Sequence, residues 1–361
     1  MAFTTINDPT KYFNTALWTG DHESGGAIKK AHPVVGLGFQ PDLFWAKVRN
    51  HTYNHILLDT TRGFRQKRII SNSTDAEDSH DYFMTSTDSD GFTTDDDVNT
   101  NEADKTYVAW CWKANGGTET HSQSETGTSL ACSTQANSTA LFSITTYTGS
   151  GTAGDKITHG LGVVPAFHIT KKRSGTEDWL VYHHKNTTAP ETDHMLFNTT
   201  DATSDSDTRF NDTAPTSTLI TYGTNGVCNG DDSTYVNYAF AEVQGYSKFG
   251  GYIGNGNADG TFVYTGFKPA FVITKRSETG GDNWHILDHK RDIDNPAVQV
   301  LQNNEPDAEG TTTTSMIDFL SNGFKCRGTG SSINTNATDY IYIAFAEQPF
   351  VTSGGVPCTA R

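Results

Sequence analysis

The pattern of apolar and polar positions along the chain predicts short β-strands rather than helices. After Pro41 the apolar residues Leu43 and Trp45 occupy alternate positions, and the same alternation follows Pro165 and Pro269. Alternate residues of a strand share one face, so each phrase predicts a strand with two apolar side chains turned inward. A lysine at the next alternate position is expected to point into solvent at the end of each strand. These lysines are Lys47, Lys171 and Lys275.

A second strand-like phrase closes each third of the chain. It occurs as "TYVAWCWKA" from Thr106, "TYVNYAFAE" from Thr234 and "DYIYIAFAE" from Asp339. One face carries large apolar groups, and the opposite face is also poor in charge. We therefore expect this strand to lie in the middle of a sheet, with both faces at least partly covered. The large apolar groups are Val108, Trp110 and Trp112, then Val236, Tyr238 and Phe240, then Ile341, Ile343 and Phe345.

These phrases belong to a unit that occurs three times. Each copy begins with a short strand-like opener that carries an aromatic residue, Trp18, Tyr147 or Tyr252. The proline phrase, a further strand, an Asp-Ala pair and the closing strand then follow in the same order. Five anchors in one order at nearly constant spacing indicate a triplication. Each copy has about 100 residues, a common size for one domain. The expected segments are a lead at 1–14, repeats at 15–114, 140–248 and 249–350, a flexible connector or loop at 115–139, and a tail at 351–361.

The fold class expected from these features is all-β. Each copy offers roughly six to eight short strands separated by clusters of Gly, Asn, Asp and Ser, which is typical of an antiparallel sandwich. The composition agrees, because the chain has 34 glycines, and no stretch sustains a helical period for three turns. We expect three tandem antiparallel β-sandwich repeats of the jelly-roll or lectin-like kind.

Charge and the lack of targeting segments restrict the function. The 361-residue chain has a formal net charge of −16. Nucleic-acid binding requires clustered Lys and Arg, and the sequence has no such cluster. No nucleic-acid partner is therefore expected. The sequence shows no signal peptide, and no apolar run approaches the roughly 18 residues of a membrane span. We expect synthesis in a cytoplasm, no membrane insertion and reduced cysteines.

An acidic run is one candidate for metal binding. Asp95, Asp97, Asn99 and Asn101 occupy alternate positions, as at the start of a calcium loop. The sixth and twelfth positions of that loop are threonines rather than the glycine and glutamate of an EF-hand. A solvated turn before the closing strand is the interpretation that we favour.

Histidine pairs and carboxylates give no clear catalytic signal. His285 and His289 would lie about 13 Å apart along a strand, too far to share one metal. His183 and His184 should point to opposite faces, so we expect surface or hydrogen-bonding roles for all four. The sequence shows no nucleophile elbow and no distinctive carboxylate pair. We expect no metal, no cofactor and no enzymatic activity.

Two tryptophans are the candidate ligand-binding residues, because they occupy equivalent positions in the second and third copies. One interpretation is an aromatic plug that packs at the edge of a sandwich. The other is a platform on which a sugar ring stacks, since hydrogen-bonding residues flank each indole. The residues of this second interpretation are Trp179 with Glu177 and Asp178, and Trp284 with Asp282 and Asn283.

The aromatic phrases also resemble a known repeat. "TYVAWCWKA", "GYSKFGGYIGNGNADGTFVYTGFKPAFVITKR" and "YIYIAFAEQPF" are similar to the repeat of virion structural and tail-fibre-like proteins of tailed, often marine, bacteriophages. The opening "FTTINDPTKYFNTALWTG" resembles the start of such proteins. The similarity covers nearly the whole chain. It implies a virion protein made in the host cytoplasm, and it brings no catalytic residues.

The function expected from this resemblance is that of a virion surface protein. We expect a tail-fibre or spike component that binds a host-surface polysaccharide, contacts other virion proteins and forms a closed homo-oligomer, by analogy a trimer. The alternatives are a capsid decoration or tail structural protein without a ligand, and, less favoured, a glycan depolymerase.

Overall fold

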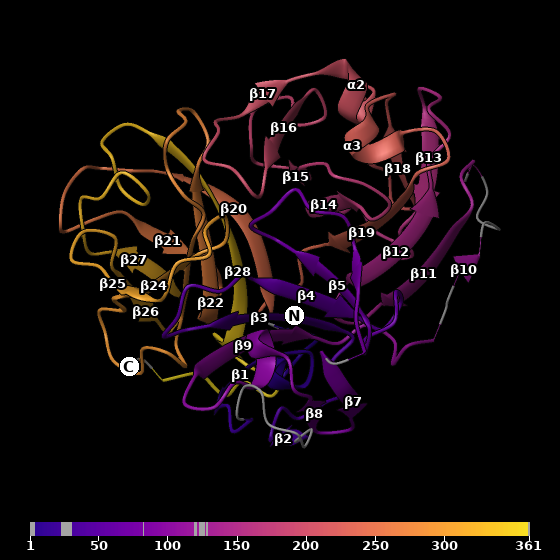
Figure 1. Cartoon of the computed structure of the whole chain (residues 1–361). Coiled ribbons are helices and arrows are strands. Elements are labelled where there is room, and N and C mark those ends of the chain that lie inside the picture. The colour runs from indigo at the N-terminus through magenta and orange to yellow at the C-terminus, as the bar shows by residue number, and fades with distance from the viewer. Residues whose placement is uncertain are drawn as a thin grey trace.

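The computed structural model describes residues 4–22, 31–81, 83–118, 121–122, 127 and 129–359. Within them the chain is built almost entirely of antiparallel strands, and these form three β-sandwich units. Figure 1 shows the units as three lobes around a common centre, from indigo for the first to yellow for the third. The expected all-β class with three sandwich repeats is confirmed. Among the described residues, no helix has the length and apolar character needed to cross a membrane.

The first unit packs a six-stranded sheet against a three-stranded sheet. The strand orders are β1-β9-β3-β4-β5-β6 and β2-β8-β7. The strands are β1 (Phe13–Thr19), β2 (His32–Val35), β3 (Leu43–Val48), β4 (Ile56–Asp59), β5 (Lys67–Ile70), β6 (Asp78–Ser79), β7 (Met84–Asp88), β8 (Gly91–Thr94) and β9 (Thr106–Trp112), with the short helices η1 (Pro9–Lys11) and α1 (Val98–Asn101).

The second unit has an eight-stranded sheet, β10-β11-β12-β19-β14-β15-β16-β17, and a two-stranded sheet, β13-β18. Its strands are β10 (His121–Ser122), β11 (Cys132–Asn137), β12 (Phe142–Thr148), β13 (Asp155–Thr158), β14 (Phe167–Lys172), β15 (Trp179–His183), β16 (Asp193–Leu196), β17 (Ser204–Asp205), β18 (Leu219–Tyr222) and β19 (Thr234–Phe240), with α2 (Asp207–Phe210) and α3 (Gly226–Asn229).

The third unit repeats the architecture of the first, with the orders β20-β28-β22-β23-β24-β25 and β21-β27-β26. Its strands are β20 (Ser247–Ile253), β21 (Phe262–Tyr264), β22 (Phe267–Arg276), β23 (His285–Asp288), β24 (Gln299–Gln302), β25 (Gly310–Thr311), β26 (Ile317–Leu320), β27 (Gly323–Cys326) and β28 (Asp339–Pro349).

Each closing strand lies in the middle of its large sheet, as expected. Strand β9 lies between β1 and β3, β19 between β12 and β14, and β28 between β20 and β22. One face of each closing strand packs inside its own sandwich, against the small sheet. The opposite face, with the large apolar residues found in the sequence, packs against the other two units. Both faces are buried because two different cores cover them.

The three large sheets therefore share one central core. Trp110 of the first unit, Tyr238 of the second and Ile343 of the third occupy equivalent positions in it. Aromatic rings meet across the unit boundaries; Phe13 and Phe345, for example, stack with ring centroids 5.0 Å apart. Copies of about 100 residues that bury one face against each other form a single body rather than three independent domains.

The repeated lysines do not leave the fold. Lys47, Lys171 and Lys275 are all fully buried, which contradicts the expectation from strand alternation. Their ammonium groups donate to main-chain carbonyls, and two of them reach the neighbouring unit: Lys171 Nζ lies 2.9 Å from Thr74 O, and Lys275 Nζ lies 3.3 Å from Thr200 O. Burial lowers the pKa of all three lysines to about 8.

The segment 115–139 is not simply a connector. Its residues 132–137 form β11, which pairs along its whole length with β12 and buries Thr134 and Gln135. The polar composition that suggested a loop is tolerated because the amide of Gln135 is hydrogen-bonded to Thr60 and Thr61 of the first unit and to Gly117 of the same segment. Positions 119–120, 123–126 and 128 lie outside the described residues.

Candidate functional site

The two candidate tryptophans lie in the central core. Trp179 and Trp284 are fully buried, so neither ring face is open to a sugar. Each indole Nε1 donates to a main-chain oxygen of the preceding unit, over 2.8 Å from Trp179 to Ile70 and 3.0 Å from Trp284 to Leu196. The expectation of a stacking platform is therefore wrong, and the indoles fasten neighbouring units together.

The residues beside Trp179 have structural contacts of their own. The carbonyl of Glu177 accepts from Lys171 Nζ over 2.7 Å, and Asp178 Oδ1 accepts from Asn198 Nδ2 over 2.8 Å. The first bond holds the turn before β15 against the end of β14, and the second holds it against the residues that follow β16. Glu177 and Asp178 do not line the cavity that is described next.

Two of the expected residues, Asp282 and Asn283, line a cavity of about 590 Å³ in the third unit. The cavity lies where the turn before β23, strands β24 and β25, and the loops before β26 and after β27 meet. Its walls are mainly hydroxyl, amide and carboxylate groups. The polar residues that line it include Asp282, Asn283, His285, Gln302, Asp307, Thr311–Ser315, Ser331 and Ser332.

His285 is one of the buried polar residues of this cavity. Its side chain is only 7% exposed, and its Nδ1 has no hydrogen-bond partner among the described residues. Burial lowers the pKa of His285 to about 4, although the nearby Asp282 carboxylate acts in the opposite direction. The imidazole is therefore neutral at physiological pH. A buried nitrogen without a partner is costly.

Asp282 is already neutralised by its surroundings. Its Oδ2 lies 3.1 Å from Arg276, and its Oδ1 accepts from the hydroxyls of Ser331 and Ser332 over 2.5 and 3.4 Å. The carboxylate thus fixes the two serines on the cavity wall. Its role is to hold the wall rather than to present a free charge.

The sister units close the equivalent space with larger side chains. The residues that follow β6, β17 and β25 make equivalent main-chain hydrogen bonds. Aligned by these bonds, Phe83 of the first unit and Arg209 of the second occupy the position of Ser315 in the third. Phe83 is buried in the first unit. In the second unit Arg209 occupies the equivalent space and donates to Asn225 Oδ1 over 2.5 Å. In the third unit, the position of Asn225 is Gly330. Small residues at two neighbouring wall positions therefore open the cavity in the third unit.

The cavity was not evident from the sequence. The stretch 310–315, "GTTTTS", has the composition of an ordinary loop. Only an alignment of Ser315 with Phe83 and Arg209 would have shown that a bulky side chain is missing, and the three copies share few residues there.

The candidate metal ligands have other functions. Asp97 caps α1 by accepting from the main-chain N of Asn99 over 2.8 Å, and Asn101 Oδ1 accepts from the main-chain N of Asp21 over 3.1 Å. Within the described parts of the chain, no three His, Cys, Asp or Glu side chains gather as a metal site would require.

The four histidines make mainly structural contacts. His183 Nε2 lies 3.2 Å from Tyr342 O, His184 Nε2 lies 2.5 Å from Phe249 O, and His289 Nδ1 lies 3.1 Å from Ala270 O. Hydrogen bonding, one of the two expected roles, therefore holds for these three. His285 alone faces the cavity.

The arrangement offers hydrogen-bonding groups to a polar ligand. Hydroxyl and amide groups converge on a volume that accommodates one or two sugar rings, and a neutral imidazole can accept or donate one hydrogen bond. Comparison with curated proteins and with solved structures gave no match. A family model described as "Domain of unknown function (DUF7483)" matches residues 8–349. The chain belongs to this DUF7483 family.

Proposed function

We propose that this chain is a surface protein of a tailed-bacteriophage particle and that it binds a host-surface saccharide in the cavity of the third unit. The observation that carries the binding role is a cavity of about 590 Å³ walled by hydroxyl and amide groups, in which Ser315 and Gly330 stand where the second unit has Arg209 and Asn225. Saccharides present the matching groups, because each hydroxyl can both donate and accept.

The setting on a phage particle is supported by the resemblance of the aromatic phrases to virion proteins. The fold suits that setting, since three units around one core give a rigid body whose loops can diverge separately. Binding by a single open cavity of this size is expected to be weak, and millimolar affinity corresponds to about 4 kcal/mol. Useful attachment would then come from many copies on one particle.

A saccharide array followed by calorimetric titration tests the proposal. The test variant is Ser315→Arg, which places in the third unit the side chain that closes the second. The control is Ser138→Arg, which adds the same charge to an exposed turn of the second unit. We expect wild type and control to bind the same saccharide, and Ser315→Arg to bind at least tenfold more weakly with unchanged thermal stability.

Two results would contradict the saccharide site. One is wild-type protein that retains no saccharide from the array, and the other is undiminished binding by Ser315→Arg. If the bound saccharide becomes shorter during incubation, the depolymerase alternative replaces the proposal.

A ligand-free structural role is the second candidate. It is favoured by the shared central core and by the partly buried ion pairs between units, which suit a rigid building block. Electron microscopy of labelled particles separates the two roles. A position on the head, together with an empty array, supports the structural role.

A further inference from the structure

The three units form three equivalent junctions around the common centre. At each junction, the edge of one unit's opening strand, β1, β12 or β20, faces the turn that follows β4, β15 or β23 of a neighbour. Strand pairing with β9, β19 and β28 fixes this equivalence. The three junctions differ in what fills the space between edge and turn.

At the β12 edge, the space is filled by a strand of this chain. Strand β11 adds antiparallel to β12, with Gln135 opposite Ile144. Gln135 Nε2 then donates to Thr60 Oγ1 and Thr61 Oγ1 of the facing turn, over 3.0 and 2.7 Å. The edge of one unit and the turn of the other are joined through an inserted strand.

At the β20 edge, the space is closed directly. His184 of the facing turn bonds to Phe249 O over 2.5 Å. The main-chain N of Phe249 donates to Glu242 Oε1 over 3.1 Å. Side chains thus satisfy the main-chain groups that an added strand would otherwise bind.

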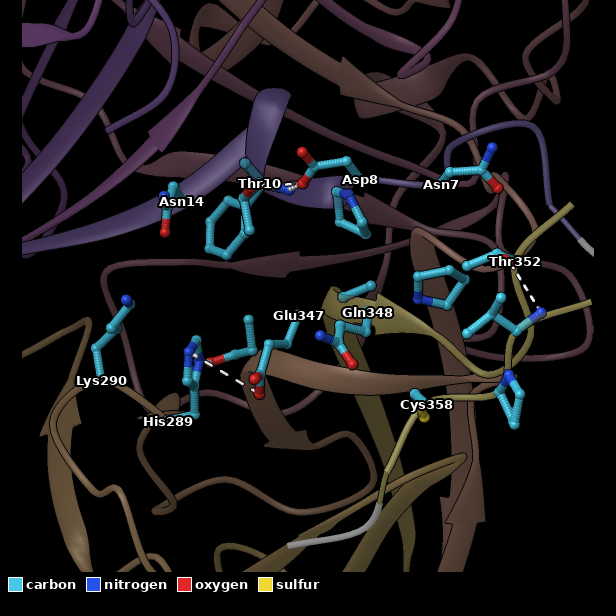
Figure 2. A pocket seen from close by; sticks show the side chains of 17 residues that line it. Asn7, Asp8, Thr10, Asn14, His289, Lys290, Glu347, Gln348, Thr352 and Cys358 are labelled. Atoms are coloured by element: carbon cyan, nitrogen blue, oxygen red, sulfur yellow. Dashed lines mark hydrogen bonds and ion pairs between the residues drawn. The ribbon is translucent and has the colours of Figure 1, made fainter. Parts of the chain in front are cut away.

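At the β1 edge, the space is an open groove of about 520 Å³. The turn residues His289 and Lys290 stand where Thr60 and Thr61 stand at the β12 edge, because they follow Asp288 as those follow Asp59. Figure 2 shows Asn14 and Thr10 on one wall, and His289, Lys290 and Glu347 on the other.

The β1 edge itself has the properties of a strand that lacks a neighbour. The main-chain O of Trp112 in β9 accepts from the main-chain N of Asp42, so the main-chain groups of Trp112 point toward β3 and away from β1. Phe13 lies opposite Trp112 and does not bond to it. The main-chain N–H and C=O of Phe13 therefore point away from β9, toward the open edge. Strand alternation gives Thr15 and Leu17 the same direction, and the main-chain N of Thr15 donates to Asn14 Oδ1 over 2.9 Å, a bond that an added strand would replace. Leu17 is 38% exposed, although it lies in a strand whose other side is fully paired.

An apolar residue beside this edge is also uncovered. Val35 of β2 is 76% exposed, whereas Thr158, its equivalent in β13, is fully buried in the unit that carries β11. Pairing of Val34 with Phe92 and of Ile157 with Ile220 fixes this equivalence.

We propose that the groove at the β1 edge binds an extended segment of a partner protein, which adds antiparallel to β1 as β11 adds to β12. Exposed sheet edges bind peptides in this way, with main-chain bonds giving affinity and side-chain pockets giving specificity. This inference is independent of the saccharide site.

The groove also indicates the chemistry of the segment. Glu347 lies 3.3 Å from Lys268 and 4.0 Å from His289, so its charge is balanced. Lys290 is exposed and makes no ion pair with the described residues. The residue at the place of Gln135 should therefore be acidic, because a carboxylate there would meet the Lys290 ammonium.

A peptide copied from β11 tests the proposal. The probe has the sequence of residues 131–138 with Cys132→Ser and Gln135→Glu. A control peptide also carries Ser133→Pro, which removes a main-chain donor that would face β1. We expect the probe to bind, to slow amide exchange at Phe13, Thr15 and Leu17, and to lose at least tenfold affinity in the proline control.

A charge exchange makes the test specific. Lys290→Glu should weaken the acidic probe at least tenfold, and a probe with Gln135→Lys should restore binding to that variant. Three results would overturn the proposal: no binding of the acidic probe up to about 1 mM, protection of β12 instead of β1, or a Lys290→Glu variant that binds the acidic probe as well as wild type. Dimerisation of the protein alone that the probe reverses would also overturn it, because the occupant would then be a second copy.

Discussion

At the scale of single residues, buried polar groups in the three copies vary together across unit boundaries. Tyr238 donates to Asp59 Oδ2 over 2.6 Å, and Trp110 Nε1 donates to Asp288 Oδ2 over 3.0 Å. At the third boundary the equivalent of these donors is Ile343, and the equivalent of the two aspartates is His183. At this position a buried carboxylate occurs only where the neighbour supplies a donor, as expected from the cost of an unpaired charge.

This pairing predicts unequal effects for two similar substitutions. Tyr238→Phe removes a donor from a buried carboxylate and should cost about 1–3 kcal/mol of unfolding free energy. Tyr246→Phe should change it by less than about 0.5 kcal/mol, because the buried Tyr246 hydroxyl has no hydrogen-bond partner among the described residues. Urea unfolding of both variants measures the difference. Equal losses would show that the Asp59 bond contributes nothing particular.

The cavity histidine predicts a pH effect of defined sign. The pKa of His285 falls from 6.5 to about 4 on folding. Above pH 6.5 both states are neutral and the residue has no effect. Between pH 6.5 and 4 the unfolded state takes up a proton and the folded state does not, so stability falls by up to about 1.4 kcal/mol per pH unit. Below pH 4 both states are protonated and the loss stops growing.

His285→Leu isolates that contribution, because leucine is the residue at this position in the second unit, Leu180. The loss of unfolding free energy between pH 7 and pH 5 should be smaller in the variant by about 1–2 kcal/mol. An identical pH dependence of the two proteins would mean that His285 is not kept neutral by burial.

At the scale of elements, the same set of contacts holds the end of each opening strand against the loop that precedes each closing strand. Gly20, Gly149 and Gly254 end the openers, and an added Cβ would lie 2.2–2.6 Å from a main-chain oxygen of that loop. A buried asparagine then accepts from the residue after each glycine: Asn101, Asn229 and Asn334. The aromatic opener stacks on the tyrosine of the closing strand, with centroids 5.0–5.1 Å apart.

The close approach predicts that Gly20→Ala should cost about 1–3 kcal/mol, since the main chain must shift to admit a methyl group. Gly310→Ala is the matched control, because the described residues leave its Cβ position open. It should change the unfolding free energy by less than about 0.5 kcal/mol. Thermal unfolding of both variants gives the comparison, and similar losses would refute the steric explanation.

Strand pattern was enough to predict the elements but not what covers them. Alternation around Trp45 and Trp110 located the strands and their apolar faces, because burial selects large side chains at every second residue. The same alternation misplaced Lys47, whose ammonium is capped by Val48 O and His51 O at 2.7 and 3.1 Å. The sequence also left two interpretations open for Trp179, because its hydrogen-bond partner, Ile70, lies 109 residues away. Contacts between units leave no periodic signal.

At the scale of the whole molecule, one core and three unequal junctions explain how copies of one unit serve different purposes. Two boundaries contain a partly buried ion network. In one, Glu77 bridges Arg62 and Arg173, and in the other Glu309 bridges Arg291 and Arg49. At the third boundary the equivalent residues are uncharged: Thr203 is bonded to Asn186 over 2.5 Å and to Ser277 O over 2.9 Å.

The three units therefore differ from one another at places that do not contribute to the shared core. The third sandwich opened a polar cavity where its sisters have Phe83 and Arg209, and the β1 edge kept a groove where β12 has an added strand. Neither change touches the central faces of β9, β19 and β28. The expected homo-oligomer remains a prediction, and the threefold arrangement is already present within one chain.

The shared core is the central claim, and native-state hydrogen exchange of Trp110→Ala tests it most directly. Removing this fully buried indole should cost about 3–5 kcal/mol, from lost burial and the cavity left behind. If the units are one cooperative body, amides of β19 and β28 should lose the same free energy of protection as those of β9. Protection lost in β9 alone, with β19 and β28 unchanged, would show that the three sandwiches are independent.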